Sequence, residues 1–309
     1  MEGNALTFDK PKLLLQERGW EYQLNHQGVH VKDGEESLQL TDVPCEVTAR
    51  WRHVQSEQDQ RYAPKMGVFV DFYRGGTVVN SVQIAYDDIS SDKAIDKIFD
   101  NLGYSVHMGK AAGFSYGQCL RNYLKLARPP TTYNIHTKSG WSDDGRLFVA
   151  GPEVVAGGTE MDIGDSTKAP CLSPSTGSIE DWQKHVAQPL LAQNHACYQW
   201  AVTLPLGAAL MPLVGFPLNS RGGFHLFGDS STGKSLALRV ACSVLGDSPK
   251  TWETTSSKLE LVASEGNHRL LCLDEIGQAN KKEVVASAYK LAAGIGKDRT
   301  NANMEDVGA

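Results

Sequence analysis

The chain has 309 residues, of which 41% are hydrophobic, and a formal net charge of -6. This length can bury a substantial core and favours about two domains, which excludes a disulfide-stabilised miniature protein. The negative charge provides no overall attraction for nucleic acid, so any such contact must come from a local surface, a pore or a segment outside this chain.

The cysteines and the N-terminus indicate an intracellular protein. None of the cysteines forms the Cys-x-x-Cys pair typical of a zinc site, and we expect reduced, mostly buried thiols at Cys45, Cys119, Cys171, Cys197, Cys242 and Cys272. Residues 1–10 lack the basic start and apolar stretch of a signal peptide, which predicts a cytoplasmic location. Residues 196–218 carry no charge, but three prolines interrupt them, so we expect a buried core segment rather than a membrane span.

The first half of the sequence predicts a strand-rich α+β domain over residues 1–150. Alternating apolar residues predict strands over 28–32, 46–53, 67–73 and 77–86, with a hairpin turn at Arg74-Gly75-Gly76. Apolar residues at helical spacing predict helices over 91–102 and 115–127, and extended structure resumes at 133–141 and 146–149.

Residues 151–178 are rich in glycine, proline, serine and threonine, which predicts a linker or long surface loop. A helix over 179–193, capped by Ser178, is expected to open the second domain, which spans 179–309.

The strongest functional signal in the sequence is a P-loop motif between a short apolar strand expected at 224–227 and a helix expected at 236–245. It consists of Gly228, Asp229, Ser230, Ser231, Thr232, Gly233, Lys234 and Ser235. The glycines allow backbone N–H groups to surround a phosphate, and the following helix N-terminus favours an anion. Lys234 is expected to bind the outer phosphates of ATP, and the Ser235 hydroxyl to bind Mg²⁺.

A second motif lies about forty residues further on, where the apolar run 269–273 ends in Asp274 and Glu275. This arrangement resembles a Walker B strand. We expect Asp274 to hold Mg²⁺ and Glu275 to orient and polarise the attacking water, so that Lys234 and Glu275 are the predicted catalytic residues.

The spacing of the motifs predicts alternating strands and helices, including a strand at 251–255, a helix at 256–265 capped by Ser256 or Ser257, and a helix at 281–293. The predicted fold class is α/β, with a parallel-sheet P-loop NTPase domain of the AAA+ or superfamily 3 helicase kind after the α+β domain. This domain lacks a later sensor strand and an arginine finger, so we expect it to be C-terminally incomplete. Residues 294–300 predict a surface loop, in which Lys297 or Arg299 are candidate phosphate or DNA contacts.

The sequence resembles the domain of unknown function 927 family of bacteria and phages. The likeness lies in residues 222–228 with the P-loop motif, 238–241, 251–252, 273–279 and 294–299, and upstream in Ser139-Gly140-Trp141 and Trp182. Members are P-loop ATPases of mobile elements and phages, often found beside primase-like domains and described as helicases or primase-helicases. The resemblance, not residue chemistry, implies single-stranded or forked DNA and primase-type replication proteins as partners.

Three functions are therefore expected, in decreasing order of support. The first is an ATP-dependent DNA helicase or translocase, acting as a homo-oligomer, for which a hexamer is one candidate. The second is a nucleotide-switched module that binds DNA or protein without moving strands. The third is a small-molecule kinase, against which Glu275 argues because a kinase must exclude water.

Overall fold

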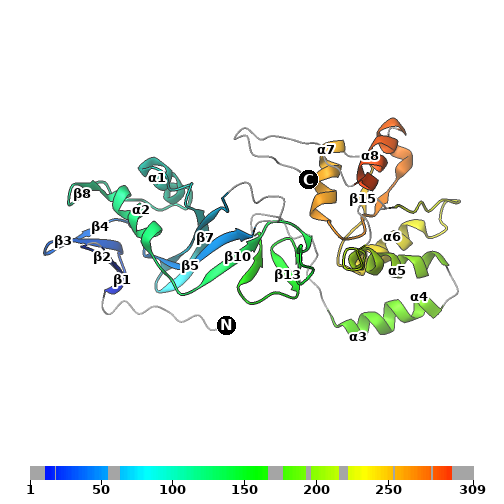
Figure 1. Cartoon of the computed structure of the whole chain (residues 1–309), viewed down its shortest axis with the longest axis horizontal. Coiled ribbons are helices and arrows are strands. Elements are labelled where there is room, and N and C mark those ends of the chain that lie inside the picture. The colour runs from blue at the N-terminus through cyan, green and yellow to red at the C-terminus, as the bar shows by residue number, and fades with distance from the viewer. Residues whose placement is uncertain are drawn as a thin grey trace. The chain divides into compact units, whose positions relative to one another are not determined.

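The computed structural model describes residues 11–17, 19–54, 63–165, 177–192, 196–215, 222–252, 255–279 and 281–293. The chain divides into two compact units, Met1–Ile135 and His136–Ala309. Each unit has its own strands and helices (Figure 1). The division into 1–150, 151–178 and 179–309 that composition suggests stays a prediction.

Two larger sheets form most of the first unit. One is an antiparallel meander in the order β1 (Lys12–Glu17), β2 (Trp20–Asn25), β3 (Gly28–Asp33) and β4 (Glu36–Gln39). The strands of the other sheet in this unit follow the order β10 (Thr132–His136), β5 (Cys45–Val54), β6 (Met66–Arg74) and β7 (Thr77–Ala85). The predicted hairpin is confirmed, because Arg74 pairs with Thr77 across Gly75 and Gly76, whose φ angles are 59° and 82°.

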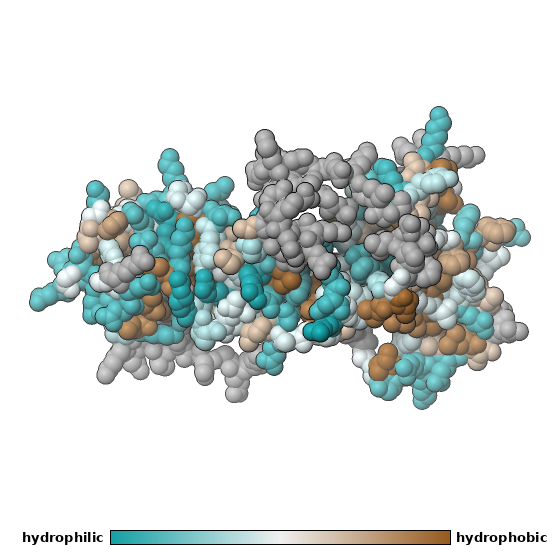
Figure 2. Space-filling model, in the orientation of Figure 1, coloured by the Kyte–Doolittle hydropathy of each residue, from teal (hydrophilic) through white to brown (hydrophobic). Residues whose placement is uncertain are grey.

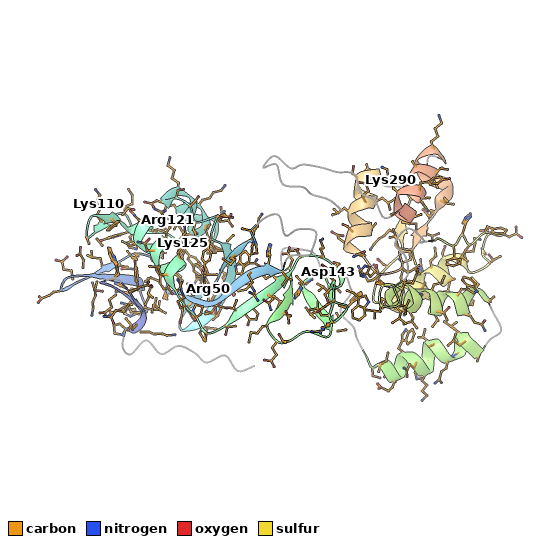
Figure 3. All side chains as sticks on the ribbon, viewed as in Figure 1. Arg50, Lys110, Arg121, Lys125, Asp143 and Lys290 are labelled. Atoms are coloured by element: carbon orange, nitrogen blue, oxygen red, sulfur yellow. The ribbon has the colours of Figure 1, made fainter. Side chains whose placement is uncertain are left out.

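Two helices pack against these sheets, and both were predicted from the sequence. Helix α1 (Asp92–Asn101) begins after Ser91, whose side chain accepts a hydrogen bond from the Ala94 N–H, and α2 (Tyr116–Leu126) begins after Ser115 in the same way. Such caps satisfy N–H groups that the helix itself leaves unpaired. Arg121 of α2, labelled in Figure 3, forms an ion pair of 2.7 Å with Asp92 of α1. The short hairpin of β8 (Lys110–Ala111) and β9 (Phe114–Ser115) precedes α2.

Aromatic and aliphatic side chains from the strands and both helices form one continuous core in the first unit. Phe72 of β6 is fully buried there, with Tyr104 stacked at 5.2 Å and Phe99 at 5.4 Å between ring centroids. Trp51 and Tyr73 are also buried. The inward-facing residues of the strands and the apolar faces of the helices thus form the core of this unit.

The second unit opens with short strands. β11 (Gly140–Trp141), β12 (Phe148–Ala150) and β13 (Glu153–Ala156) form an antiparallel sheet, and β14 (Asp162–Gly164) follows. The last two strands lie within the stretch predicted as a linker or surface loop. A contact of 3.0 Å between His136 Nε2 and Asp162 Oδ1 joins the first residue of this unit to β14.

Helices make up most of the remaining described chain. The predicted helix after Ser178 is present, with Ser178 accepting a hydrogen bond from the Asp181 N–H, but it runs through a π-helical turn. Helix α7 is capped by Thr255 and not by the predicted Ser256 or Ser257. Lys290 of α8, labelled in Figure 3, forms an ion pair of 3.1 Å with Glu260 of α7. The bounds are α3 Ile179–Trp182, η2 Gln183–Ala187, α4 Gln188–Ala192, α5 Ala196–Leu210, α6 Lys234–Ser243, α7 Ser256–Glu265, η4 Ile276–Gln278 and α8 Lys281–Ala293.

Helix α5 lies in the uncharged stretch 196–218 and has Pro205 inside it. Its 15 residues are too short to cross a bilayer, whose hydrocarbon core is about 30 Å thick and needs roughly 20 residues. In the part of the chain that the structure describes, no helix has the length and apolar character needed to cross a membrane. Ala201, Val202 and Pro205 are buried, whereas Trp200 is exposed, and hydrophobic residues are visible on the surface around α5 (Figure 2). The cytoplasmic location stays a prediction.

The parallel-sheet NTPase domain predicted for the C-terminal part is wrong. Among the described residues, the parallel pairing there is limited to β15 (Lys250–Thr251) and β16 (Leu273–Asp274), two residues each. The apolar run before the P-loop motif forms no strand, and Phe224 and Phe227 are 61% and 86% exposed. A short apolar run has the same composition in an extended loop as in a buried strand, so the pattern did not separate the two.

Candidate nucleotide-binding site

The P-loop segment (residues 228–235) folds as a tight turn that leads directly into α6. Gly228 has a φ of 144° and Gly233 a φ of 90°, conformations that glycine adopts without the strain a Cβ would cause. Lys234 and Ser235 are the first two residues of α6, and no side chain caps the N-terminus of this helix. The first N–H groups of α6 therefore face the segment where an anion would be stabilised.

Lys234 closes the P-loop segment on itself. Its Nζ donates hydrogen bonds to the Gly228 carbonyl at 3.0 Å, to the Asp229 carbonyl, and to Thr232 Oγ1 at 3.3 Å. Thr232 Oγ1 donates in turn to the Asp229 carbonyl at 2.9 Å. The ammonium group is thus held at the centre of the turn by neutral acceptors. A phosphate oxygen would offer the same group a stronger, charge-assisted hydrogen bond.

Asp274 is the last residue of β16 in the short parallel pair, and Glu275 follows it. Thr251 pairs with Asp274, and the Trp252 N–H donates to the Asp274 carbonyl at 3.2 Å. The Asp274 carboxylate accepts a hydrogen bond from the Glu275 N–H at 2.9 Å. Glu275 is exposed and has the left-handed angles φ 60° and ψ 44°, which are uncommon outside glycine. Ser231 of the P-loop segment shares this feature, with a φ of 62°.

A small core joins the two motifs. Ala237, Ala241 and Cys242 of α6 pack with Cys272, which precedes β16, and with Ala201 of α5. The helix that begins at Lys234 therefore packs against the segment that ends at Asp274. The structure places both motifs around one core, while the hydrogen bonds of Lys234 run to the P-loop segment and not to the two carboxylates. Lys297 and Arg299 lie outside the described residues.

Tyr198 of α5 is a neighbour of the P-loop segment that sequence reasoning missed. A Cβ added at Gly233 would lie 2.6 Å from the Tyr198 hydroxyl oxygen, so the phenol reaches the second glycine of the motif. No spacing rule links two residues that are 35 positions apart, and only the packing of α5 on α6 brings them together.

We expect Gly233→Ala to weaken ATP binding at least about 10-fold, because a left-handed alanine costs about 1–2 kcal/mol and its methyl group would displace Tyr198. Titration calorimetry with ATP and Mg²⁺ measures the change. Gly207→Ala is the matched control, since Gly207 lies within α5 and a Cβ there meets nothing within 4 Å. Equal affinities of the Gly233→Ala variant and the wild type would contradict the importance of this turn.

The Ser139-Gly140-Trp141 sequence connects several elements of the second unit through hydrogen bonds. The Trp141 N–H donates to His268 Nδ1 at 3.0 Å, and the Trp141 indole N–H donates to the Ala209 carbonyl at 2.7 Å. Gly140 has a φ of 98°, and a Cβ there would lie 2.7 Å from His268 Nδ1. These contacts connect β11 with the end of α5 and with the turn before β16, so they support the elements that hold both motifs.

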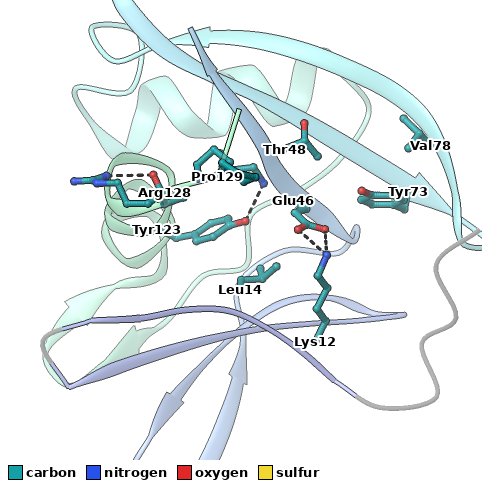
Figure 4. A pocket seen from close by; sticks show the side chains of 12 residues that line it. Lys12, Leu14, Glu46, Thr48, Tyr73, Val78, Tyr123, Arg128 and Pro129 are labelled. Atoms are coloured by element: carbon teal, nitrogen blue, oxygen red, sulfur yellow. Dashed lines mark hydrogen bonds and ion pairs between the residues drawn. The ribbon is translucent and has the colours of Figure 1, made fainter. Parts of the chain in front are cut away.

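A separate hollow of about 470 Å³ lies in the first unit (Figure 4). At its edge, Lys12 Nζ contacts both carboxylate oxygens of Glu46 at 2.7 Å. The buried Tyr123 hydroxyl accepts a hydrogen bond from the Val47 N–H at 2.9 Å, and burial raises the pKa of this phenol well above its usual value. The charges of Lys12 and Glu46 offset each other, while Arg128, which also lines the hollow, donates hydrogen bonds to the Lys125, Leu126 and Ala127 carbonyls.

The structure thus defines a protein with a strand-rich first unit and a mainly helical second unit, in which the helix after a glycine-bounded P-loop segment shares a small core with the residue just before β16. A family model described as "Domain of unknown function (DUF927)" matches residues 14–305. The chain belongs to this family, which confirms the resemblance seen in the sequence. The family description names no activity. No curated protein matches the chain.

Proposed function

We propose that the chain binds ATP with Mg²⁺ at the P-loop segment and hydrolyses it. The observation with most weight is that the glycine turn ends in the uncapped N-terminus of α6 while Lys234 lies at the centre of the turn. Backbone N–H groups, a helix dipole and one ammonium group then converge on the position of a phosphate. This support does not depend on a large parallel sheet.

The donor set fits magnesium. Mg²⁺ prefers hard oxygen ligands, and the Ser235 hydroxyl and the Asp274 carboxylate are such ligands on elements of one small core. When bound, the ion would neutralise charge on the phosphates. Lys234 would exchange the Gly228 and Asp229 carbonyls for phosphate oxygens, and Glu275 would orient a water molecule and accept its proton.

The experiment compares full-length wild type with Glu275→Gln. We expect Glu275→Gln to bind ATP as wild type does but to release phosphate at least about 100-fold more slowly, because the amide cannot accept the proton. Glu180→Gln, at an exposed carboxylate of α3, is the control and should hydrolyse ATP normally. Absence of ATP binding by the wild type in the presence of Mg²⁺ would overturn the proposal.

A DNA-dependent motor is the form of this activity that the family resemblance favours. The test adds single-stranded or forked DNA to the hydrolysis assay and expects stimulation. If the rate of ATP hydrolysis is the same with and without DNA, the motor is refuted and a DNA-independent ATPase remains.

A nucleotide-switched module is the second candidate. The closed arrangement of Lys234 favours it, because phosphate binding would have to release the ammonium from three acceptors and so reshape the P-loop segment. Tight ATP binding without turnover, with or without DNA, would support the switch over the motor.

A further inference from the structure

Strand β7 (Thr77–Ala85) is an exposed sheet edge that carries no charge. It is the last strand in the order of its sheet and pairs with β6. None of its 9 residues is charged or a proline, and the first five are exposed. Among the described residues, no backbone hydrogen bond joins residues 77–82 to any element other than β6. An edge of this kind presents N–H and C=O groups with which another strand can pair.

The edges of the β1–β4 meander are protected against such pairing, whereas β7 is not. β4 is only 4 residues long and begins with Glu36, and β1 carries Lys12 and Glu17 and has a register shift along its length. Charges, short strands and irregular register are the usual means by which proteins prevent edge-to-edge association. In β7 the register shifts only near the start, and Asn80–Ala85 pair with β6 without interruption.

Ser81, at the centre of β7, directs its backbone N–H away from β6. The Tyr86 N–H donates to the Met66 carbonyl of β6 at 2.9 Å, just beyond the end of β7. In an antiparallel pair, alternate residues direct their N–H groups to the same side, so the N–H groups of Ile84 and Val82 also face β6. The Ser81 N–H and C=O therefore lie on the outer edge of the sheet, where the residue is exposed.

We propose that β7 is the interface for a second copy of this chain, with the two β7 strands paired antiparallel about a two-fold axis at Ser81. The Ser81 N–H of each copy then donates to the carbonyl of Ser81 of the partner subunit, and the sheet continues across both copies. A two-fold axis brings identical strands together, and the uncharged sequence of β7 places no like charges opposite each other. This interface lies in the first unit and does not depend on the proposed ATPase activity.

The charges that flank β7 favour the antiparallel arrangement. The exposed Arg74 lies just before the hairpin turn that leads into β7, and the exposed Asp87 and Asp88 follow the end of the strand. Antiparallel pairing puts the start of one β7 beside the end of the other, so Arg74 approaches Asp87 and Asp88 of the partner subunit. Within one chain, the 9 residues of β7, about 30 Å, separate Arg74 from these acids. The symmetry creates this attraction twice.

Analytical ultracentrifugation of the native full chain measures the association. We expect a dimer of twice 33.7 kDa with a dissociation constant of about 10 µM, because one strand pair is a small interface. Ser81→Pro removes the outward N–H but no hydrogen bond to β6, so it should weaken the dimer at least about 10-fold and keep the wild-type circular dichroism spectrum.

Ser37→Pro, in the edge strand β4, is the matched control. The Leu40 N–H donates to the Val29 carbonyl of β3 at 2.7 Å, so the N–H of Leu38 also faces β3 and that of the exposed Ser37 points away. The control therefore makes the same substitution at an equivalent edge position of the other sheet. We expect it to dimerise as the wild type does.

An exchange of charges tests the ends of the interface without changing the backbone of β7. Arg74→Glu should weaken the dimer several-fold, because it places like charges at both ends of the strand pair. Adding Asp87→Arg and Asp88→Arg to this variant should restore dimerisation, since the exchanged charges again attract between copies.

Two results would overturn the proposal. One is a wild-type chain that stays monomeric at about 100 µM, well above the expected dissociation constant, which would leave this edge to a strand of another protein. The other is a dimer whose affinity neither Ser81→Pro nor Arg74→Glu changes, because the two copies would then associate through another surface.

Discussion

Replacing Lys234 with alanine should lower ATP affinity about 100-fold. The variant loses an ammonium group that would make two charge-assisted hydrogen bonds to phosphate oxygens, each worth about 1.5 kcal/mol at the low end of the usual range. Their sum of about 3 kcal/mol corresponds to roughly two orders of magnitude in the dissociation constant. Titration calorimetry with ATP and Mg²⁺ measures the effect directly.

The control for this variant is Lys258→Ala, at an exposed lysine in the first turn of α7. It makes the same change in net charge and should leave ATP affinity within a factor of about two, because long-range attraction is screened at ordinary ionic strength. Among the described residues, the Lys234 ammonium bonds only within the P-loop segment, so both variants should keep the wild-type circular dichroism spectrum. Similar affinities of the two variants would place the ATP site elsewhere.

Replacing Phe72 with alanine should lower the free energy of unfolding of the first unit by about 3–5 kcal/mol. The ring is fully buried between Phe99 and Tyr104, with one edge-to-face and one stacked contact, and the small alanine side chain leaves a cavity in the core. Denaturant titration followed by circular dichroism measures the loss.

Val78→Ala is the matched control, since Val78 lies in the adjacent strand β7 and is 45% exposed. We expect it to cost less than about 1 kcal/mol, because an exposed side chain leaves no cavity. A loss below about 1 kcal/mol for Phe72→Ala would show that the core of the first unit is not packed as described.

The sequence predicted the first unit best where the signal is local. The hairpin at Gly75-Gly76 follows from two residues that tolerate positive φ between alternating strands, and Ser91 and Ser115 mark helix starts through their own hydrogen bonds. Strands β1 and β2 went unpredicted. Their burial depends on packing against β3 and α2, which the sequence does not show.

The second unit shows where a motif misleads. The P-loop pattern predicted the start of α6 within two residues, because glycines and a helix start are local features. It also suggested a strand at 224–227 and a parallel sheet around it, but a strand needs partners that the motif does not specify. The approach of Tyr198 to Gly233 depends on how α5 and α6 pack, so no pattern in the sequence pointed to it.

Because the backbone at Glu275 is left-handed, the residue that is best for stability at this position differs from the residue that is best for catalysis. A glutamate held there costs roughly 1–2 kcal/mol of torsional energy, which glycine would avoid and asparagine would reduce. Neither replacement offers a carboxylate. Directed evolution for heat resistance alone would therefore favour replacing Glu275, and, under the proposed function, the resulting variants would hydrolyse ATP poorly.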